Sequence, residues 1–222
     1  MLPAGRRGRR PPGERAQGAA ARGFRSFGQV DAGILVRVGT GRRPDRSLCV
    51  PVDVHYLSAA GARAAAAVAA DAAFSRVLAE HTVTVAEVAA YRPGEFYRRE
   101  LPPLRTVPAA IDGLGLLVID GYADLDPAGR PGPGVHAHRV FAVPVTGVAT
   151  SAFCTATHAV PVLRGTSARP LHVTAAGMPR ADAAQLVRRM TGRFRLPDAL
   201  RRAGQLARTG PPAPLQGSHR PG

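Results

Sequence analysis

Two aspartates in apolar runs are the residues of this sequence best placed to do chemistry. Asp120 ends the apolar run Gly115–Ile119 and is followed by Gly121. Asp53 lies inside a second run, Cys49–Tyr56. Short apolar runs bounded by turn residues are typical of buried strands, although a buried helix can have the same signature. A carboxylate there is costly unless it is paired or coordinates a metal, so two such acids indicate a metal site at the centre of a sheet.

Each acid also has a purely structural interpretation. An aspartate at a strand end, such as Asp120, is often only a turn or capping residue. Asp53 is harder to explain in this way, because an unpaired carboxylate within an apolar strand is penalised. Glu100 follows Arg98 and Arg99 and fits a surface ion pair of small energetic value. Taken one at a time, these residues leave both interpretations open.

The segments around Asp53 predict three strands. Cys49–Tyr56 is a strand in which Asp53 and His55 share one face, because side chains alternate along a strand. The segment 63–69 has the composition of a helix, but its place between two strand candidates, together with the family resemblance given below, favours a strand. Thr82–Val88 alternates and is rich in β-branched residues, which indicates a third strand. Together the three segments predict an antiparallel meander.

The rest of the chain is expected to mix helices and strands. A helix at about 103–112 leads into the strand that ends at Asp120, and this layout predicts a crossover to a parallel neighbour. The other expected helices are Val135–Ala142, Ala181–Met190 and Asp198–Arg208, and the other expected strands are Val143–Ala149, 159–163 and 170–174.

Charge is the strongest signal in the composition. The 222 residues include 30 Lys plus Arg and 15 Asp plus Glu, so the net charge is +15, and every basic residue is Arg. This balance favours a polyanion as the partner. The absence of Lys, together with many Ala, Gly and Pro, is typical of the coding bias of a GC-rich genome. Arg in place of Lys is therefore not a functional choice site by site.

The two ends of the chain differ from its middle. Residues 1–28 are rich in Arg, Gly and Pro, and a disordered extension is favoured over a dedicated nucleic-acid arm. Residues 29–47 form an unassigned lead-in, and 209–222 are expected to be a disordered tail. No apolar run is long enough to span a bilayer, and the Arg-rich start lacks the core of a signal peptide. We therefore expect a cytoplasmic protein without a membrane partner. We also expect a monomer.

Six motifs follow one another in the order found in endonuclease V, a family of ribonuclease H-like nucleases. They are Val52–Val54, Tyr91-x-Pro93-Gly94 with Arg99-Glu100, Leu117–Gly121, Val143-Pro144-x-x-Gly147-Val148-Ala149, Arg169–Leu171 and Arg193–Pro197. Residues 48–208 therefore resemble an endonuclease V catalytic domain. The resemblance implies an α/β fold with a ribonuclease H-like mixed sheet, an antiparallel meander plus parallel strands, flanked by helices.

The resemblance also implies an enzyme. Members of the family are Mg²⁺-dependent endonucleases that recognise deoxyinosine, the product of adenine deamination, in DNA, and some recognise inosine in RNA. They cut the second phosphodiester bond on the 3′ side of the lesion and leave 3′-hydroxyl and 5′-phosphate ends. Asp53, Glu100 and Asp120 match the family's acidic residues, and such hard oxygen ligands suit Mg²⁺. Mn²⁺ is expected to substitute.

Five further residues match substrate-binding features of the family. Tyr91, Pro93 and Gly94 match the wedge that enters the duplex where the inosine is extruded. Gly121 and its neighbours resemble the wall of the inosine pocket. His136 matches a family histidine in the helix after a Gly-rich turn. The resemblance therefore implies DNA that contains deoxyinosine as the partner.

The sequence departs from the family pattern at three positions. Asp126 stands where members often have a His, and Thr150 stands where a Lys is usual. A late His is missing, its place being taken by Gly177 or Ala176. Asp124 and Asp126 are possible accessory acids that could supply replacement ligands. We expect a divergent but active branch; the alternatives are an inactive inosine or nucleic-acid binder, or a nuclease that prefers inosine in RNA.

Overall fold

A computed structural model describes residues 48–57, 61–89 and 96–210, with the side chains of 96–98 left aside. The strands are β1 (Leu48–Tyr56), β2 (Ala62–Ala69), β3 (Val77–Val85), β4 (Leu114–Asp120), β5 (Val145–Ala149), β6 (Val160–Val162) and β7 (Leu171–Ala176). The helices are α1 (Phe96–Thr106), the 3-10 helix η1 (Pro108–Ala110), α2 (Pro133–Phe141), α3 (Arg180–Arg189) and α4 (Asp198–Thr209). The expected wedge (Tyr91, Pro93 and Gly94), segments 1–28 and 29–47, and most of the expected tail lie outside the described residues.

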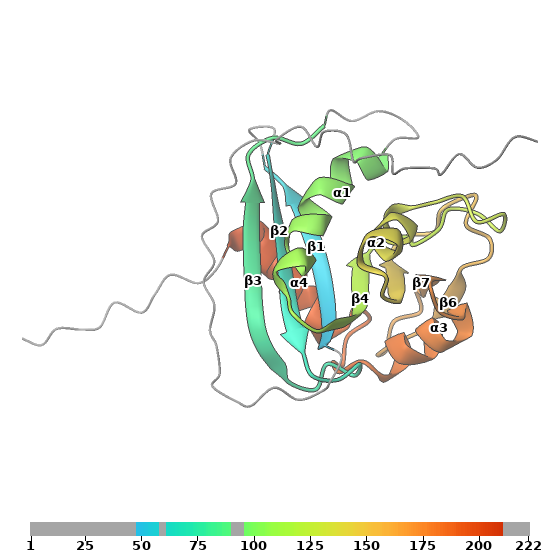
Figure 1. The fold of residues 1–222 in the computed structure, drawn as a ribbon. Coiled ribbons are helices and arrows are strands. Elements are labelled where there is room, and N and C mark those ends of the chain that lie inside the picture. The colour runs from blue at the N-terminus through green and yellow to red at the C-terminus, as the bar shows by residue number, and fades with distance from the viewer. Residues whose placement is uncertain (1–47, 58–60, 90–95, 211–222) are drawn as a thin grey trace, which may run out of the picture.

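The described strands form one seven-stranded sheet in the order β3-β2-β1-β4-β5-β7-β6 (Figure 1). β1, β2 and β3 pair antiparallel, which confirms the predicted meander. β4 runs parallel to β1 and to β5, which confirms the predicted crossover. β7 pairs antiparallel with β5 and with β6. The expected mixed sheet flanked by helices is therefore confirmed.

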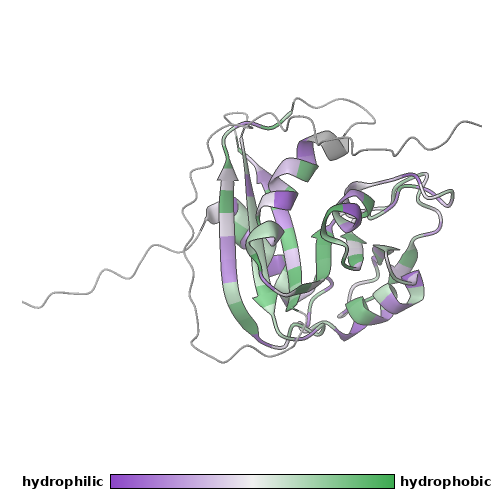
Figure 2. Ribbon diagram, in the orientation of Figure 1, coloured by the Kyte–Doolittle hydropathy of each residue, from purple (hydrophilic) through white to green (hydrophobic). Residues whose placement is uncertain are grey.

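Helices cover both faces of this sheet. One hydrophobic core joins α1 and α2 to the face that carries Val52 and Ile119. A second core joins α3 and α4 to the face that carries Cys49 and Val118. Burial on both faces explains why the central strands have continuous apolar sequences, visible in the green colour of β4 (Figure 2). Among the described residues, no helix has the length and hydropathy needed to cross a membrane.

The strand β2 allows α4 to pack close to the sheet. Ala65 of this strand packs against Leu206 and Ala207 of α4. Ala203 and Gly204 are also buried on the same helix. Because all but one of these residues have minimal side chains, the backbone of α4 comes near the strands. This close approach matters for the site described below.

Two elements begin well before the residue that the sequence predicts. α1 begins at Phe96 instead of about 103, so Pro102 and Pro103 lie inside it. A proline interrupts the helical hydrogen bonds, but α1 persists because Leu104 packs into the core. β3 begins at Val77 instead of Thr82, since it pairs with β2 along the whole length of that strand. Because α1 begins at Phe96, Glu100 is a helical residue.

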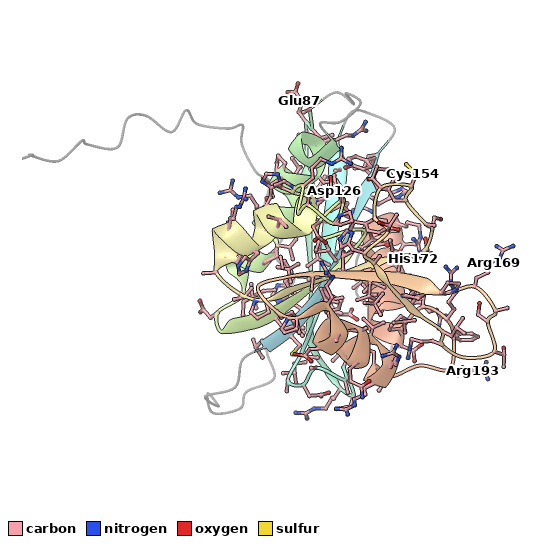
Figure 3. The ribbon with its side chains drawn as sticks, turned by 90° about the vertical axis from the view of Figure 1, so that its right-hand side faces the viewer. Glu87, Asp126, Cys154, Arg169, His172 and Arg193 are labelled. Atoms are coloured by element: carbon pink, nitrogen blue, oxygen red, sulfur yellow. The ribbon has the colours of Figure 1, made fainter. Side chains whose placement is uncertain are left out.

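Exposed arginines mark one side of the molecule. Arg169 and Arg193 both extend outward there (Figure 3). The Arg193 guanidinium lies 4.8 Å from the centroid of the Phe194 ring, and Arg201 lies 4.5 Å from the same ring. An exposed aromatic ring is thus flanked by two cations. Such a surface suits a polyanion that also carries flat bases.

Candidate active site

Asp53 and Asp120 lie side by side on neighbouring strands. Val52 of β1 is level with Ile119 of β4, so the next residue of each parallel strand is an aspartate. Neighbouring strands are about 4.8 Å apart. Val52 and Ile119 face the core under α1 and α2, so the two aspartates point to the opposite face, the one that α4 covers. The register of the parallel pair therefore brings the two strand-borne acids together.

Glu100 approaches the same place from α1. The neighbouring Arg99 stacks on Tyr56, with its Cζ 4.1 Å from the centroid of the ring. Because Tyr56 is the last residue of β1, this contact holds α1 beside the end of the strand that carries Asp53. Glu100 is half-buried and is repelled by Asp120 and Asp53. Glu100 of α1 thus lies near enough to the two strand aspartates to be repelled by both.

Burial raises the pKa of all three acids, and repulsion adds to the rise at two of them. Burial, followed by repulsion from Asp120 and Asp53, raises the pKa of Glu100 from 4.5 to about 8. Burial and then Asp53 raise the pKa of Asp120 from 3.8 to about 6, against an opposing effect of Arg208. Burial also raises the pKa of Asp53, although the Val54 amide donates to its Oδ1 (2.8 Å). Perturbed carboxylates of this kind cluster at functional sites.

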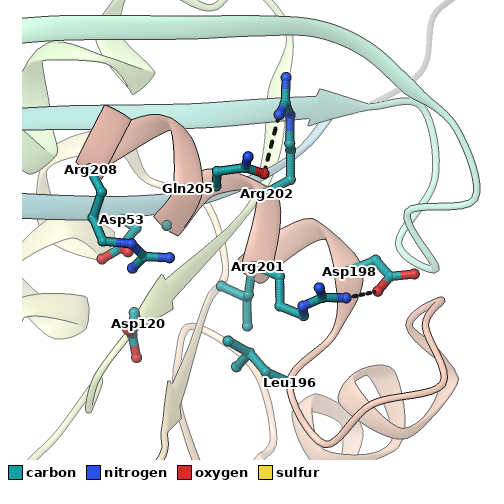
Figure 4. A pocket seen from close by; sticks show the side chains of 10 residues that line it. Asp53, Asp120, Leu196, Asp198, Arg201, Arg202, Gln205 and Arg208 are labelled. Atoms are coloured by element: carbon teal, nitrogen blue, oxygen red, sulfur yellow. Dashed lines mark hydrogen bonds and ion pairs between the residues drawn. The ribbon is translucent and has the colours of Figure 1, made fainter. Parts of the chain in front are cut away.

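The two aspartates open into a pocket of about 690 Å³ between the sheet and α4 (Figure 4). The other walls come from α4 and the turn before it: Leu196, Asp198, Leu200, Arg201, Arg202, Gly204, Gln205 and Arg208. Asp120 is exposed to this space, and Asp53 is half-buried in it. The acidic pair is therefore accessible to a substrate or an ion from the α4 side.

The loop after β4 holds the end of this strand in place. Gly121 has a φ of +123°, a conformation that favours glycine. The amide of Ala123 donates to the buried Oγ1 of Thr174 (2.7 Å). A Cβ at Gly147 would lie only 2.7 Å from the carbonyl oxygen of Gly121, so a glycine on β5 is what lets the loop cross that strand. Gly121, the expected pocket wall, thus follows Asp120 in a closely packed loop.

The expected accessory acids both have partners within the protein. Asp124 is buried, and its Oδ1 lies 3.0 Å from His158 Nε2. Asp126 accepts a hydrogen bond from the amide of Arg130 (2.9 Å) and pairs with its guanidinium (3.2 Å). This second arrangement closes a turn, a common role of aspartate. Within the described part of the chain, neither acid lines the pocket that holds the two strand aspartates.

The remaining positions of interest lie on other elements. His136 is half-buried on α2, and burial lowers its pKa. Thr150 is exposed, and its carbonyl oxygen accepts a hydrogen bond from Arg195. Gly177 has a φ of +72°, and a Cβ there would overlap the ring of His138. Position 177 is therefore a tight turn with no room for a histidine.

The acids fit a hard divalent cation by type. Asp53, Glu100 and Asp120 offer only oxygen ligands, which Mg²⁺ and similar ions prefer. Burial raises the pKa of all three acids, and repulsion between carboxylates adds to the rise at Glu100 and Asp120. A bound cation would stabilise the ionised forms. Among the residues that the structure describes, no three His, Cys, Asp or Glu side chains are grouped closely enough to hold an ion. The fit thus rests on the chemistry of the donors and on the accessible aspartate pair.

Gly204 and Arg208 belong to this site, although they lie outside every motif found in the sequence. They are four residues apart on α4 and so share one helix face. A Cβ at Gly204 would lie 2.8 Å from Asp53 Oδ2 and 3.3 Å from Arg208 Nη1. A glycine in a helix interior often marks a close approach, which is the signal available in the sequence. That signal does not say which residue is approached.

Comparisons with known proteins agree with this architecture. No family model matches the chain. The chain is 33% identical over 195 residues to endonuclease V of Streptomyces avermitilis, across 77% of this chain and 80% of that protein. A crystal structure of endonuclease V from Streptomyces avermitilis has a TM-score of 0.61 at 27% identity and covers 79% of this chain and 85% of that one.

A second solved structure shows the same fold. Endonuclease V of Ciona intestinalis, solved with DNA that contains an inosine followed by a ribo-adenosine, has a TM-score of 0.63 at 18% identity. The match covers 74% of this chain and 85% of the Ciona chain. The Streptomyces sequence match, which spans most of both proteins, decides the assignment. The chain therefore belongs to the endonuclease V family.

Proposed function

We propose that this protein hydrolyses the second phosphodiester bond on the 3′ side of deoxyinosine in DNA, with a divalent cation such as Mg²⁺, and leaves 3′-hydroxyl and 5′-phosphate ends. The observation that carries the proposal is the level placement of Asp53 and Asp120 on parallel strands, with Glu100 near enough to be repelled by both. Membership of the endonuclease V family supports the same reaction class.

Two observations support DNA as the substrate: the net charge of this chain and the structure of a relative bound to DNA. The Ciona relative was solved with DNA that contains an inosine. The net charge of +15 favours binding to a phosphate backbone. In this proposal Tyr91, Pro93 and Gly94 form the wedge, and Gly121 with His136 contributes to the pocket for the extruded base. A base must leave the stack before a protein can read it in this way.

The acidic residues have separate roles in this proposal. When bound, a divalent cation lowers the pKa of a coordinated water and offsets charge on the phosphate. Asp53 and Asp120 would hold that cation, with Glu100 as the third carboxylate. In the free protein Glu100 has a pKa of about 8, so it holds a proton near neutral pH. Mn²⁺ accepts the same oxygen ligands and is expected to substitute.

The test is cleavage of an end-labelled DNA duplex that carries one deoxyinosine, in Mg²⁺, Mn²⁺ or EDTA. A duplex with deoxyadenosine at the same place is the substrate control. We expect one product, cut one nucleotide beyond the lesion, which EDTA abolishes. Asp120→Asn should lose the product. Asp112→Asn, the same change at an exposed aspartate just before β4, should keep it.

Three results would contradict the proposal in different ways. Binding of the deoxyinosine duplex without cleavage in either metal would identify an inosine-binding module. Cleavage only when the inosine lies in RNA would show a requirement for the 2′-hydroxyl and overturn the DNA assignment. Cleavage by Asp120→Asn at the parent rate would place the chemistry elsewhere in the molecule.

A further inference from the structure

We infer that Arg208 serves as a fixed cation at the acidic centre, which consists of Asp53, Glu100 and Asp120. In this role Arg208 binds the substrate phosphate and takes the place of a second metal ion. The phosphate contact rests on the proposed function. The position of the guanidinium beside the carboxylates does not, because it follows from the packing of α4.

The geometry at Gly204 brings Arg208 to the acids. One point, the place that a Cβ at Gly204 would take, lies 2.8 Å from Asp53 Oδ2, 3.3 Å from Arg208 Nη1 and 3.5 Å from Arg208 Nη2. Figure 4 shows the Arg208 side chain extending from α4 toward Asp53, with Asp120 close by. Any side chain at position 204 would fill this space. The glycine therefore keeps the space open for the guanidinium.

The last turn of α4 is fastened to the sheet just where Arg208 lies. Arg63 of β2 donates from Nη1 to the carbonyl oxygens of Arg208 (3.0 Å) and Ala207 (3.4 Å). Ala65, two residues further along the same strand, packs on Leu206 and Ala207. A cation at the C-terminus of a helix also interacts favourably with the helix dipole. The backbone of Arg208 is thus held in place, and its side chain is directed at the acidic centre.

The other α4 arginines in the pocket are engaged elsewhere. Arg201 pairs with Asp198 (3.1 Å). Arg202 donates to both carboxylate oxygens of Glu80 (2.5 and 2.7 Å). The charge of Arg208 acts instead on the two strand aspartates, where it opposes the rise in pKa that burial causes. Arg208 is therefore the pocket arginine available to a substrate phosphate.

The chemistry of the guanidinium suits both parts of the inference. Its planar set of N–H donors matches two oxygens of a phosphate, and it stays charged at every accessible pH. A permanent positive charge next to Asp53 also repels a second divalent cation. The acidic centre should therefore bind one metal ion, with Arg208 as the second positive charge near the scissile phosphate.

The first test measures metal binding without DNA. Titration of the full chain with Mn²⁺, followed by electron paramagnetic resonance, should show one bound ion. Arg208→Ala should bind Mn²⁺ more tightly, because a neighbouring positive charge is gone. We expect its dissociation constant to fall about tenfold. Arg188→Ala, at an exposed arginine of α3, removes the same charge and should bind like the parent. Equal dissociation constants for Arg208→Ala and the parent would overturn the inference.

The second test measures the phosphate contact. At saturating metal, Arg208→Ala should cut the deoxyinosine duplex about 10²-fold more slowly, the usual loss for one transition-state donor. Arg208→Lys should recover part of the rate, since it keeps the charge but not the planar fork. A parent rate in Arg208→Ala would overturn the phosphate contact.

The two proposals fail in distinguishable ways. If the parent protein cuts no inosine substrate, the proposed function fails. Tighter Mn²⁺ binding by Arg208→Ala would then still support Arg208 in the position of a second metal ion. Thermal melts of each variant, compared with the parent, verify that the substitutions leave the fold intact.

Discussion

Two charged centres of this protein are built in opposite ways. Arg164 is 7% exposed, and its guanidinium donates to backbone carbonyl groups of the segment 190–195. At the acidic centre, burial raises the pKa values of Asp53, Glu100 and Asp120, and repulsion from neighbouring carboxylates adds to the rise at Glu100 and Asp120. At the first centre, backbone carbonyl groups accept hydrogen bonds from the guanidinium. At the second centre, acidic side chains lie near other acidic side chains.

This difference indicates that Arg164 stabilises the fold, whereas Asp53, Glu100 and Asp120 serve the proposed reaction. A buried cation surrounded by carbonyl oxygens is tolerated, because hydrogen bonds replace its water. Acids whose pKa values are raised on folding lower the stability of the folded state. The segment 190–197 leads directly into α4, so Arg164 also fixes the start of the helix that forms one wall of the acidic pocket.

Asp53→Asn should have the largest effect on cleavage. It tests whether an acid of the site serves the reaction and not the stability of the fold. The substitution keeps the size of the side chain and the acceptor for the Val54 amide, but it removes a charge and a metal ligand. We expect deoxyinosine cleavage to fall by about 10³-fold or more, which corresponds to several kcal/mol. The melting temperature should not fall. Single-turnover cleavage and calorimetry measure the two effects, and a clear loss of stability would show that Asp53 holds the fold.

Arg164→Met should produce the reverse pattern. Methionine fills part of the space but leaves the carbonyl groups of 190–195 without their donor. We expect the free energy of unfolding in urea to fall by roughly 3 kcal/mol. Arg169→Met, at an exposed arginine, should change it by less than about 0.5 kcal/mol. Equal stabilities for the two variants would remove the distinction between the centres.

Glu100→Gln should make the protein more stable in a pH-dependent way. Glu100 has a pKa of about 8 in the folded state against an ordinary value of 4.5, so its ionised form opposes folding. The penalty is absent below pH 4.5, grows as the pH rises and is complete above pH 8. We expect a gain of about 2 kcal/mol at the top of this range, after allowance for solvent screening.

Urea unfolding of Glu100→Gln at a series of pH values measures this gain. Glu87→Gln, at an exposed glutamate, is the matched control and should show no such trend. A gain that is independent of pH would point to packing instead of charge.

Asp126→Asn should have the smallest effect. Its carboxylate closes a turn with Arg130, an exposed interaction that contributes less than about 1 kcal/mol. We expect cleavage within about threefold of the parent and an unchanged Mg²⁺ requirement, since one surface ion pair is all that is lost. Titration of the cleavage rate with Mg²⁺ measures both. A tenfold or larger rise in the half-maximal Mg²⁺ concentration would instead make Asp126 an accessory metal ligand.

The sheet was predictable because its signals are local. The continuous apolar runs and the β-branched residues of the β1 and β4 sequences do not depend on distant partners. α1 was expected to begin at about 103, but it begins at Phe96 and includes Pro102 and Pro103. The packing of Leu104 into the core holds this helix, and the local sequence does not reveal that core. A proline is a local signal, but the burial that overrides it is not.

Local sequence patterns were enough to predict that Asp53 and Asp120 lie on apolar strands, that a meander precedes a crossover, and that the chain resembles endonuclease V. The tertiary structure alone decided that the two aspartates are level, that Glu100 joins them from a helix, and that Gly204 admits Arg208 to the same place. The physical reason is distance along the chain. Strand character follows from neighbouring residues, whereas the meeting of charges depends on strand register and on how closely small side chains let α4 pack.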